Sequence, residues 1–381
     1  MFSVSTQFFH FDNPGAPLRL HAGAQLPRFT LAYETYGQLS AARDNAILLF
    51  HAMTGSQHAA GFNPEVPGVD GRWTAEMHEG WWDGFIGPGR ALDTDRFFII
   101  CANYLGGCYG STGPTSLDSN GEIWGADFPA IRLADIVDSQ LHLVESLGIE
   151  TLHAAVGASI GGLLALSLAT RHPNRVRNVV PIATGLETSI TTRMLNFEQI
   201  NAIETDPKFC AGAYDLSDPP TQGLALARRI AHKTFRSLPS LKELARDERI
   251  SNVPPFGWYE MNAPVESYML HQGRKFVERF DANSYLRILD AWQWFDIARE
   301  GRAESVRELF ARCRDQKFLV FSIDSDLSFP PAEQGHLVEI LEGAGADVLW
   351  VTVHSGKGHD SFLLEPKLYA PHLRALLMGE S

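Results

Sequence analysis

Ser159 stands in a G-x-S-x-G motif formed by residues 157–161. A short apolar run, LHAAV, precedes the motif, and an apolar segment of helical length follows it and ends before Pro173. This pattern predicts a sharp strand–helix turn that exposes the serine hydroxyl, with glycines where a Cβ would clash with the neighbouring strand or helix. The start of the helix would stabilise negative charge near the serine. We therefore predict that Ser159 is a nucleophile; the alternative is a glycine-rich turn with an incidental serine.

A serine nucleophile needs a base that takes its proton and an acid that orients the base. Where the serine stands on a strand–helix turn, the acid and then the base follow it along the chain, each just past a late strand. Asp324 and Asp326 follow the apolar run KFLVFSI, and we favour Asp326 because it lies in the loop proper. His354 and His359 follow the next apolar run, and we favour His359 because its glycine-rich loop would let it reach across to the serine.

Two further groups would complete such a site. An oxyanion hole needs two backbone N–H groups, and we expect them on Ile160, directly after the nucleophile, and on Met53 in the early loop HAMTG. We interpret His51 of this loop as a side chain that supports the site by packing, with a second base as the alternative. Asp360 adjoins His359, so its side chain would point away from the imidazole ring. It is therefore a candidate for holding a substrate amine rather than for the acid.

Apolar runs of strand length alternate with amphipathic segments of helical length. Residues 1–27 are expected to form an antiparallel edge segment or a hairpin. After them, strands are predicted at residues 28–35, 45–50, 97–102, 152–156, 176–183, 317–323 and 348–353, and helices at residues 133–147, 332–342 and 366–378. Continuous apolar runs suit strands buried on both faces of a parallel sheet. The alternation predicts an α/β fold with a mostly parallel sheet flanked by helices.

The pattern changes between residues 186 and 300, where short apolar strand runs are absent and a mostly helical segment rich in charged and aromatic residues is expected. The clearer helices in this segment are predicted at residues 223–237 and 276–297. We interpret the segment as a helical lid inserted into a core made of residues 1–185 and 301–381. Such a lid would exclude water and shape the choice of substrate.

Composition narrows the classes of partner. The 381 residues carry a formal net charge of −13, which would repel nucleic acids and anionic membranes. The four cysteines have no metal-ligand spacing, so we predict no metal site and expect free buried thiols in a reducing compartment; they are Cys101, Cys108, Cys210 and Cys313. The first residues lack the pattern of a signal peptide, and no apolar run is long enough to span a bilayer. We therefore expect a cytoplasmic protein.

The chain resembles the homoserine O-acetyltransferase (MetX-type) family of α/β-hydrolase-fold acyltransferases over nearly its whole length. The matching stretches are YETYG, HAMTG, GWWDGFIGPG, DTDRFF, LGGCYGSTGP, DFP, GASIGG, GLALAR, SDLSFPP and GHDSFL. The resemblance implies a catalytic triad of Ser159, Asp326 and His359. It also implies that Arg228 and Asp360 bind the amino-acid substrate, and the planar fork of Arg228 would suit a carboxylate. The alternative for Arg228 is a solvated charge on a helix.

The resemblance further implies ping-pong transfer of an acyl group from acetyl-CoA to L-homoserine, without a bound cofactor, in a homodimer formed through the lid helices. Succinyl-CoA as donor and serine as acceptor remain alternatives, because the sequence departs from the family at Ile160, at Ala134 and in the loop that follows Asp326. An esterase or thioesterase on the same fold is a rival, since it needs no amino-acid site. A non-catalytic binding protein is a second rival, which the complete set of serine, aspartate and histidine disfavours.

Overall fold

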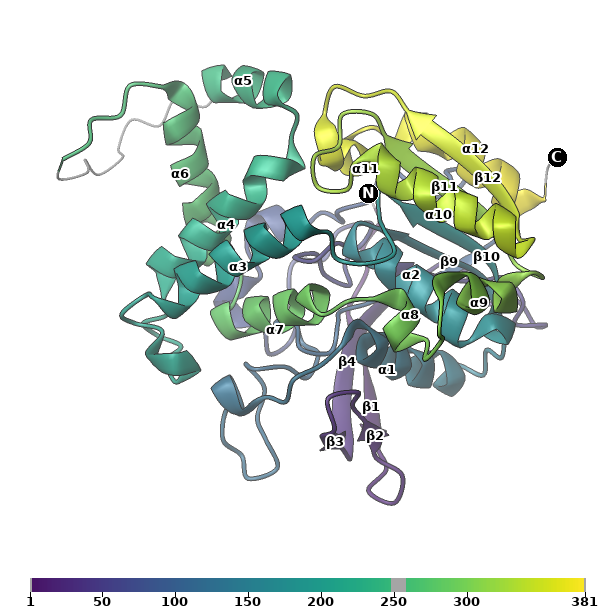
Figure 1. Cartoon of the computed structure of the whole chain (residues 1–381). Coiled ribbons are helices and arrows are strands. Elements are labelled where there is room, and N and C mark those ends of the chain that lie inside the picture. Colours follow the sequence, from purple (N-terminus) through teal and green to yellow (C-terminus); the bar gives the residue numbers. More distant parts are fainter. Residues whose placement is uncertain (1, 248–257, 380–381) are drawn as a thin grey trace.

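A computed structural model describes residues 2–247 and 258–379 of the chain (Figure 1). In this described part, eight strands form one sheet in the order β1-β4-β8-β5-β9-β10-β11-β12. The strands are β1 (Gln7–Asp12), β4 (Arg28–Tyr36), β5 (Ala46–Phe50), β8 (Phe98–Ala102), β9 (Leu152–Ala158), β10 (Val176–Ile182), β11 (Lys317–Ile323) and β12 (Asp347–Val353). Two-residue strands form two small ribbons elsewhere: β2 (Leu18–Arg19) with β3 (Gln25–Leu26), and β6 (Ile86–Gly87) with β7 (Leu92–Asp93).

The sheet is parallel except at one edge. β1 pairs antiparallel with β4, and β4 pairs antiparallel with β8, whereas all other neighbours are parallel. Every residue of β5 is buried, as expected for a strand covered on both faces. β1 lies at the edge and mixes exposed with half-buried positions. The predicted α/β fold, including its antiparallel edge, is confirmed.

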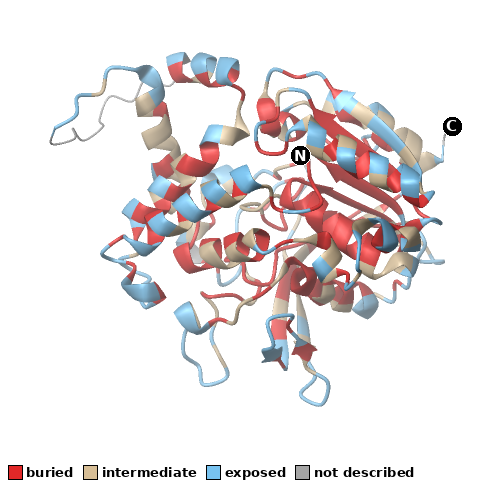
Figure 2. Ribbon diagram, viewed as in Figure 1, coloured by how far each residue is buried: buried red, intermediate tan, exposed pale blue. Residues whose placement is uncertain are grey.

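Helices and a long loop cover the two faces of the sheet. The helices α1 (Leu133–Ser146), α2 (Ile160–Arg171) and α10 (Pro331–Ala344) pack on one face, with the short helix α9 (Val306–Phe310) beside α10. α2 is buried over almost its whole length (Figure 2), which explains its uniformly apolar sequence. The other face is covered by α12 (Pro366–Met378) and by the loop between β5 and β8, where the rings of Trp82 and Phe85 stack at 4.1 Å.

A second group of helices lies beside the sheet in Figure 1. It contains α3 (Ile190–Glu204), α4 (Thr221–Phe235), α5 (Leu238–Asp247), α6 (Pro264–Val277) and α7 (Ala282–Gln293), followed by the short helix α8 (Ile297–Glu300). The single helix predicted at residues 276–297 is wrong. The chain breaks after Val277 because Asp281 caps a new helix, accepting a hydrogen bond from the amide of Ser284 at 2.7 Å.

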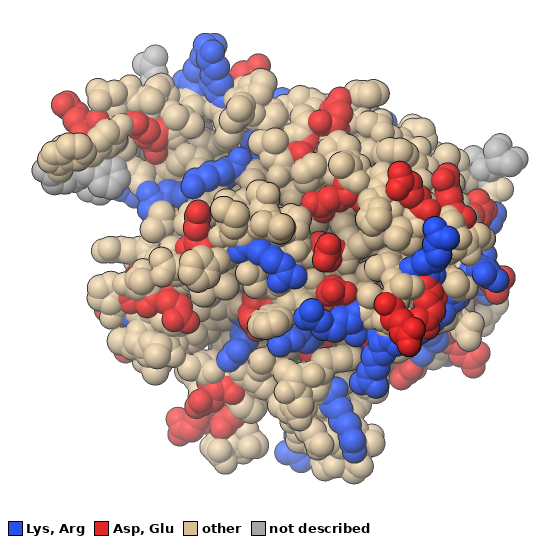
Figure 3. Space-filling model, in the orientation of Figure 1, with Lys and Arg blue, Asp and Glu red and all other residues tan. Residues whose placement is uncertain are grey.

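The surface carries charges of both signs, and one of the four cysteines differs from expectation. On the face shown in Figure 3, lysine and arginine side chains lie in several groups between acidic ones. All four cysteines are free, but Cys210 is exposed, so the expectation of four buried thiols is wrong at that position. In the described residues, no helix has the length and apolar character needed to cross a membrane.

Candidate active site

The turn between β9 and α2 holds Ser159 in an unusual backbone conformation, with φ of 58° and ψ of −127°. L-residues rarely adopt such a positive φ, and it is maintained only where the surrounding structure enforces it. The neighbouring glycines allow the crowding, as predicted. A Cβ on Gly157 would lie 2.1 Å from the carbonyl oxygen of Gly161, and a Cβ on Gly161 would lie 2.5 Å from that of Phe50. The turn therefore presents the serine at the carboxyl end of the central strand.

Loops after β11 and β12 bring Asp326 and His359 together. Oδ2 of Asp326 lies 2.6 Å from Nδ1 of His359, and both side chains are buried. Oδ1 of Asp326 accepts hydrogen bonds from the amides of Ser328, at 2.7 Å, and Phe329, at 3.0 Å. The carboxylate is thus fixed by its own loop while it orients the imidazole. The two competing residues, Asp324 and His354, pair with each other at the surface instead.

The surroundings of His359 favour its protonated form. Burial alone would lower the pKa of the imidazole, but the charge and hydrogen bond of Asp326, with a further contribution from Asp360, raise the pKa above 6.5. The ring of Phe329 stacks beside the imidazole at a centroid distance of 5.7 Å. These contacts hold the ring in place and make it a stronger base than an isolated histidine.

One pocket, with about 940 Å³ of empty space including its open mouth, collects most of the predicted site residues. Its lining includes Met53, Ser159, Arg228, His359 and Asp360. Within the described residues, the hydroxyl of Ser159 makes no hydrogen bond to His359, a contact that is often long in enzymes without substrate. Apolar side chains such as Leu195, Phe362 and Leu363 line the pocket beside its polar groups, as is usual for small-molecule sites.

The loop that holds Met53 leaves an amide available. In the part of the chain that the structure describes, the Met53 N–H donates to no backbone or side-chain acceptor. Ile160 is the first residue of α2, so its amide has no partner within the helix. His51 packs as predicted: its ring stacks on Tyr104 at 3.6 Å, and burial lowers its pKa to about 4.

Arg228 is not the solvated charge that the alternative interpretation described. Its guanidinium lies over the rings of Phe276, at 4.8 Å, and Phe235, at 5.1 Å, and burial, together with the charge of Arg279, lowers its pKa to about 10. None of the described carboxylates forms an ion pair with it. The neighbouring Arg229 instead donates to the carbonyl of Ala225 on its own helix.

Arg236 is a residue beside the site that the sequence did not reveal. This residue follows α4, and its Nε lies 2.7 Å from Oδ2 of Asp360. Burial raises the pKa of Asp360, and the charges of Arg236, His359 and Arg228 partly offset that rise. No local sequence pattern predicts this ion pair, because it forms only where the end of α4 packs against the loop that carries His359. The only signal in the sequence is an arginine eight residues after Arg228, at the end of the same helix.

Other lining residues were also missed. α3 contributes polar side chains, and α7 contributes aromatic ones; the set comprises Thr191, Thr192, Asn196, Gln199, Tyr285 and Trp292. Of the positions where the sequence departs from the family, Leu327 and Ser328 line the pocket, whereas Ala134 is buried on α1 away from it. Among the described residues, no group of three or more His, Cys, Asp or Glu side chains could hold a metal ion.

Comparisons with known proteins agree with this geometry. Residues 45–366 match the family model of the alpha/beta hydrolase fold. The chain is 39% identical to a homoserine O-succinyltransferase of Cellvibrio japonicus, over 96% of this chain and 93% of that protein. It is 41% identical to a homoserine O-acetyltransferase of Rhodospirillum rubrum, over 96% of this chain and 90% of that protein.

A solved structure extends the likeness to three dimensions. The crystal structure of homoserine O-acetyltransferase from Bacillus anthracis superposes with a TM-score of 0.87 at 26% identity, covering 99% of this chain and 98% of that chain. Similarity in sequence and in structure therefore runs over the core and the added helices alike. On these grounds, the chain belongs to the homoserine O-acetyltransferase family of acyltransferases with the α/β-hydrolase fold.

Proposed function

We propose that this enzyme transfers an acyl group from acyl-CoA to the side-chain hydroxyl of L-homoserine, as its relatives' names suggest, through an ester on Ser159. The observation that carries the proposal is the content of one pocket. It combines a serine on a strained turn, an imidazole paired with Asp326, and the arginine Arg228, which has no carboxylate partner among the described residues. A hydrolase would need the first two features but not the third.

In the first half-reaction, His359 takes the proton of Ser159 as the serine oxygen attacks the carbonyl carbon of the thioester. The oxyanion that forms would be held by the amides of Met53 and Ile160. The carbon–sulfur bond then breaks, and the departing CoA sulfur takes the proton from His359. In the second half-reaction, the homoserine hydroxyl gives its proton to His359 and attacks the acyl carbon. The ester bond to Ser159 breaks, and the serine regains its proton.

The amino acid would be held at its two charged ends. Arg228 would bind the substrate carboxylate with its guanidinium fork, in a position where aromatic rings exclude water. Asp360, paired with Arg236, would accept the substrate ammonium group. These contacts would deliver the hydroxyl to the acyl-enzyme and favour it over water.

Acetyl-CoA is the proposed donor, with succinyl-CoA as the alternative. Relatives with both names match the chain at nearly the same identity, 39% and 41%, so identity does not separate them. Serine is the alternative acceptor. Leu327 and Ser328 line the pocket and differ from the family pattern, so these two side chains would influence which donor and acceptor bind.

Residues 186–300 would act as a lid on a core made of residues 1–185 and 301–381. Helices α3, α4 and α7 each contribute to the pocket lining, which supports a role in excluding water. The exposed face of α3 carries Ile190, Met194 and Phe197 at helical spacing, with exposed fractions of 78%, 62% and 64%. Because such an apolar stripe is unusual on a monomer, it supports a homodimer formed through these helices.

We place the enzyme in the cytoplasm, in methionine biosynthesis.

The test is mass spectrometry of enzyme quenched after mixing with acetyl-CoA or succinyl-CoA alone, combined with CoA release in the presence of homoserine, serine or neither. We expect an added acyl group on Ser159 and CoA release that depends on homoserine. A Ser159→Ala variant serves as the control and should bind no acyl group. Rapid CoA release without an amino acid would favour the thioesterase alternative, and acylation of another side chain would refute the proposed nucleophile.

A further inference from the structure

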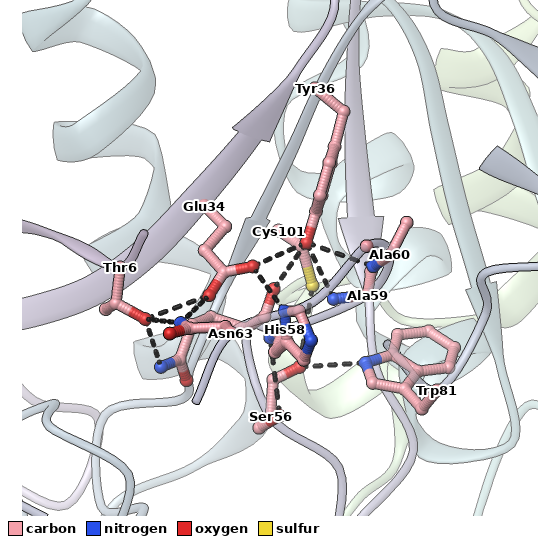
Figure 4. Close-up of polar contacts among 12 residues, drawn as sticks. Thr6, Glu34, Tyr36, Ser56, His58, Ala59, Ala60, Asn63, Trp81 and Cys101 are labelled. Carbon is pink, nitrogen blue, oxygen red and sulfur yellow. Dashed lines mark hydrogen bonds and ion pairs between the residues drawn. The ribbon is translucent and has the colours of Figure 1, made fainter. Parts of the chain in front are cut away.

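A second buried contact between a carboxylate and an imidazole lies beside the oxyanion loop, which we define as residues 51–60. It joins Glu34 on β4 to His58, with 2.8 Å between Oε2 and Nδ1 (Figure 4). The side chains are 0% and 1% exposed. The proposed reaction does not use either group. Because an isolated buried charge is costly, the other contacts of the two residues determine whether the pair is charged.

Glu34 accepts hydrogen bonds from three groups besides its contact with His58. Thr6 Oγ1 and Asn63 Nδ2 donate to Oε1 at 2.9 and 2.8 Å, and the Tyr36 hydroxyl donates to Oε2 at 2.7 Å. Burial, and then the charge of Glu34, raise the pKa of Tyr36 well above 10.0, so its hydroxyl keeps the proton that it donates. Hydrogen bonds donated to a carboxylate favour its ionised form, and three such donors, Thr6, Asn63 and Tyr36, point at the Glu34 oxygens independently of His58. These contacts favour the carboxylate form of Glu34.

His58 faces acceptors on both sides of its ring. Nδ1 contacts the carboxylate of Glu34, and Nε2 lies 3.0 Å from the carbonyl oxygen of His78. A neutral imidazole can donate from one nitrogen only, whereas an imidazolium donates from both. With Glu34 ionised, the two contacts are satisfied together only when the ring carries two N–H groups. The pair is thus a buried salt bridge with all of its polar atoms partnered.

This salt bridge anchors one end of the oxyanion loop. The Tyr36 hydroxyl that donates to Glu34 also accepts the amides of Ala59, at 2.7 Å, and Ala60, at 3.2 Å, as Figure 4 shows. Trp81 Nε1 donates to the Ser56 carbonyl at 3.0 Å. Nearer the start of the loop, Tyr104 donates to the carbonyl of His51, and Arg279 donates to that of Thr54 at 3.0 Å. The Met53 amide therefore lies in a loop whose carbonyls and amides are fixed on both sides.

We propose that Glu34 and His58 are positioning residues for acyl transfer: as a buried carboxylate–imidazolium pair, they hold the oxyanion loop so that the Met53 amide meets the developing oxyanion. The inference rests on the proposed function, because it gives the Met53 amide a catalytic task. Neither residue lines the pocket that holds Ser159, so the pair acts through the backbone of the loop.

The charge state can be measured without turnover. In enzyme labelled with ¹⁵N-histidine, NMR at pH 8 should show two protonated ring nitrogens for His58, assigned by the loss of both signals in His58→Gln. In Glu34→Gln, the amide keeps the shape of the carboxylate but would donate to Nδ1, so one ring proton should disappear. A single ring N–H on His58 in the unmodified enzyme would overturn the ionised pair.

The positioning role is measured by the kinetics. We expect Glu34→Gln to slow acyl-enzyme formation by roughly 10- to 100-fold while KM for homoserine stays within twofold, because displaced oxyanion donors affect the transition state. The matched control is Asp135→Asn. Asp135 lies on α1 and is an equally buried carboxylate, and its Oδ1 lies 3.2 Å from Nδ1 of His21. A Glu34→Gln rate near that of the unmodified enzyme, or an equal loss in Asp135→Asn, would overturn the role.

A second variant covers the case in which Glu34→Gln fails to fold. Tyr36→Phe keeps the ring but removes the contact between Glu34 and the amides of residues 59 and 60, and it should also slow acylation at least severalfold without changing KM for homoserine. An unchanged rate in Tyr36→Phe would overturn the positioning role. Absence of an acyl-enzyme in the unmodified protein would overturn the proposed function and this role together, whereas the NMR result bears on the salt bridge alone.

Discussion

Arg236 Nε lies 2.7 Å from the Asp360 carboxylate, so a residue at the end of α4 is ion-paired with the neighbour of His359. The contact is part of a wider junction. Ser237 donates to the carbonyl of Gly356, and a Cβ on Gly358 would lie only 2.5 Å from the amide nitrogen of Ser237. The helical segment is therefore joined to the loop of the proposed base through closely packed backbone as well as through charge.

The Arg236–Asp360 pair leads to a prediction about binding of the acceptor. Without the arginine, burial would raise the pKa of Asp360 further, and a neutral carboxyl group would attract the substrate ammonium less. Arg236→Met should therefore raise KM for homoserine by about 10-fold, with little change in KM for the acyl donor. Lys233→Met, on the same helix but exposed, is the control in steady-state assays. An unchanged KM for homoserine in Arg236→Met would contradict the role given to Asp360.

Arg228 and Arg229 offer a matched pair of neighbours. Arg228 lines the pocket, whereas Arg229 donates to the carbonyl of Ala225 outside it. Loss of a hydrogen-bonded charge corresponds to about 1.5–3 kcal/mol, so Arg228→Met should raise KM for homoserine by about 10- to 100-fold. Arg229→Met should leave it unchanged. Equal effects of the two substitutions would show that the carboxylate is bound elsewhere.

The pairing of Asp326 with His359 predicts a shift in the pH profile. Because Asp326 raises the pKa of His359 above 6.5, kcat/KM should fall as the pH drops through that raised pKa. In Asp326→Asn, burial dominates, so the acid limb should move to lower pH while the plateau falls about 10³-fold or more. An acid limb that stays in place would mean that another group titrates. The measurement is kcat/KM between about pH 5 and pH 9, a range that covers the titration of a histidine.

The same pairing affects stability with the opposite pH dependence. A histidine whose folded pKa is raised stabilises the protein below its unfolded pKa of about 6.5, and this contribution disappears as the pH rises through the folded pKa. Thermal unfolding should therefore show a loss of stability over that window in the unmodified enzyme. The loss should be absent in Asp326→Asn, and its persistence there would assign it to a different group.

The turn at Ser159 predicts an effect on stability. In Gly161→Ala, the new Cβ would lie 2.5 Å from the carbonyl oxygen of Phe50, which is backbone and cannot rotate away. Overpacking of this kind should reduce the free energy of unfolding by about 2–3 kcal/mol. Gly71→Ala is the control, because its Cβ would meet no heavy atom within 4 Å. Denaturant titration of both variants measures the difference, and equal stability would show that the turn can relax.

The sequence predicted the elements that depend on local pattern. The apolar runs of β5, β9 and β11 lie within two residues of their predicted bounds, because burial on both faces demands uninterrupted apolar residues. The helix predicted at residues 276–297 was wrong for a related reason. The segment contains no glycine or proline that would mark the break, and the cap at Asp281 depends on one side chain turning back to the Ser284 amide.

The candidate site divides in the same way. Ser159, Asp326 and His359 each stand just past a strand, so topology alone indicated that they would meet at one edge of the sheet. Arg236 is far in sequence from its partner Asp360, and the Glu34–His58 pair lies outside the pocket. These contacts depend on how α4, β4 and the loop after β5 pack, so they could not be predicted from residue spacing along the chain.

The order of the strands has a consequence for a chain still being synthesised. β9 and the turn bearing Ser159 are complete long before β11 and β12 join the sheet beside β10, and these last strands carry Asp326 and His359. A nascent polypeptide that has emerged only through its helical segment holds a serine alcohol but no imidazole to activate it. The proposed reaction can therefore begin only after β11, β12 and the loops that follow them have been synthesised, so unfinished chains should not consume thioester.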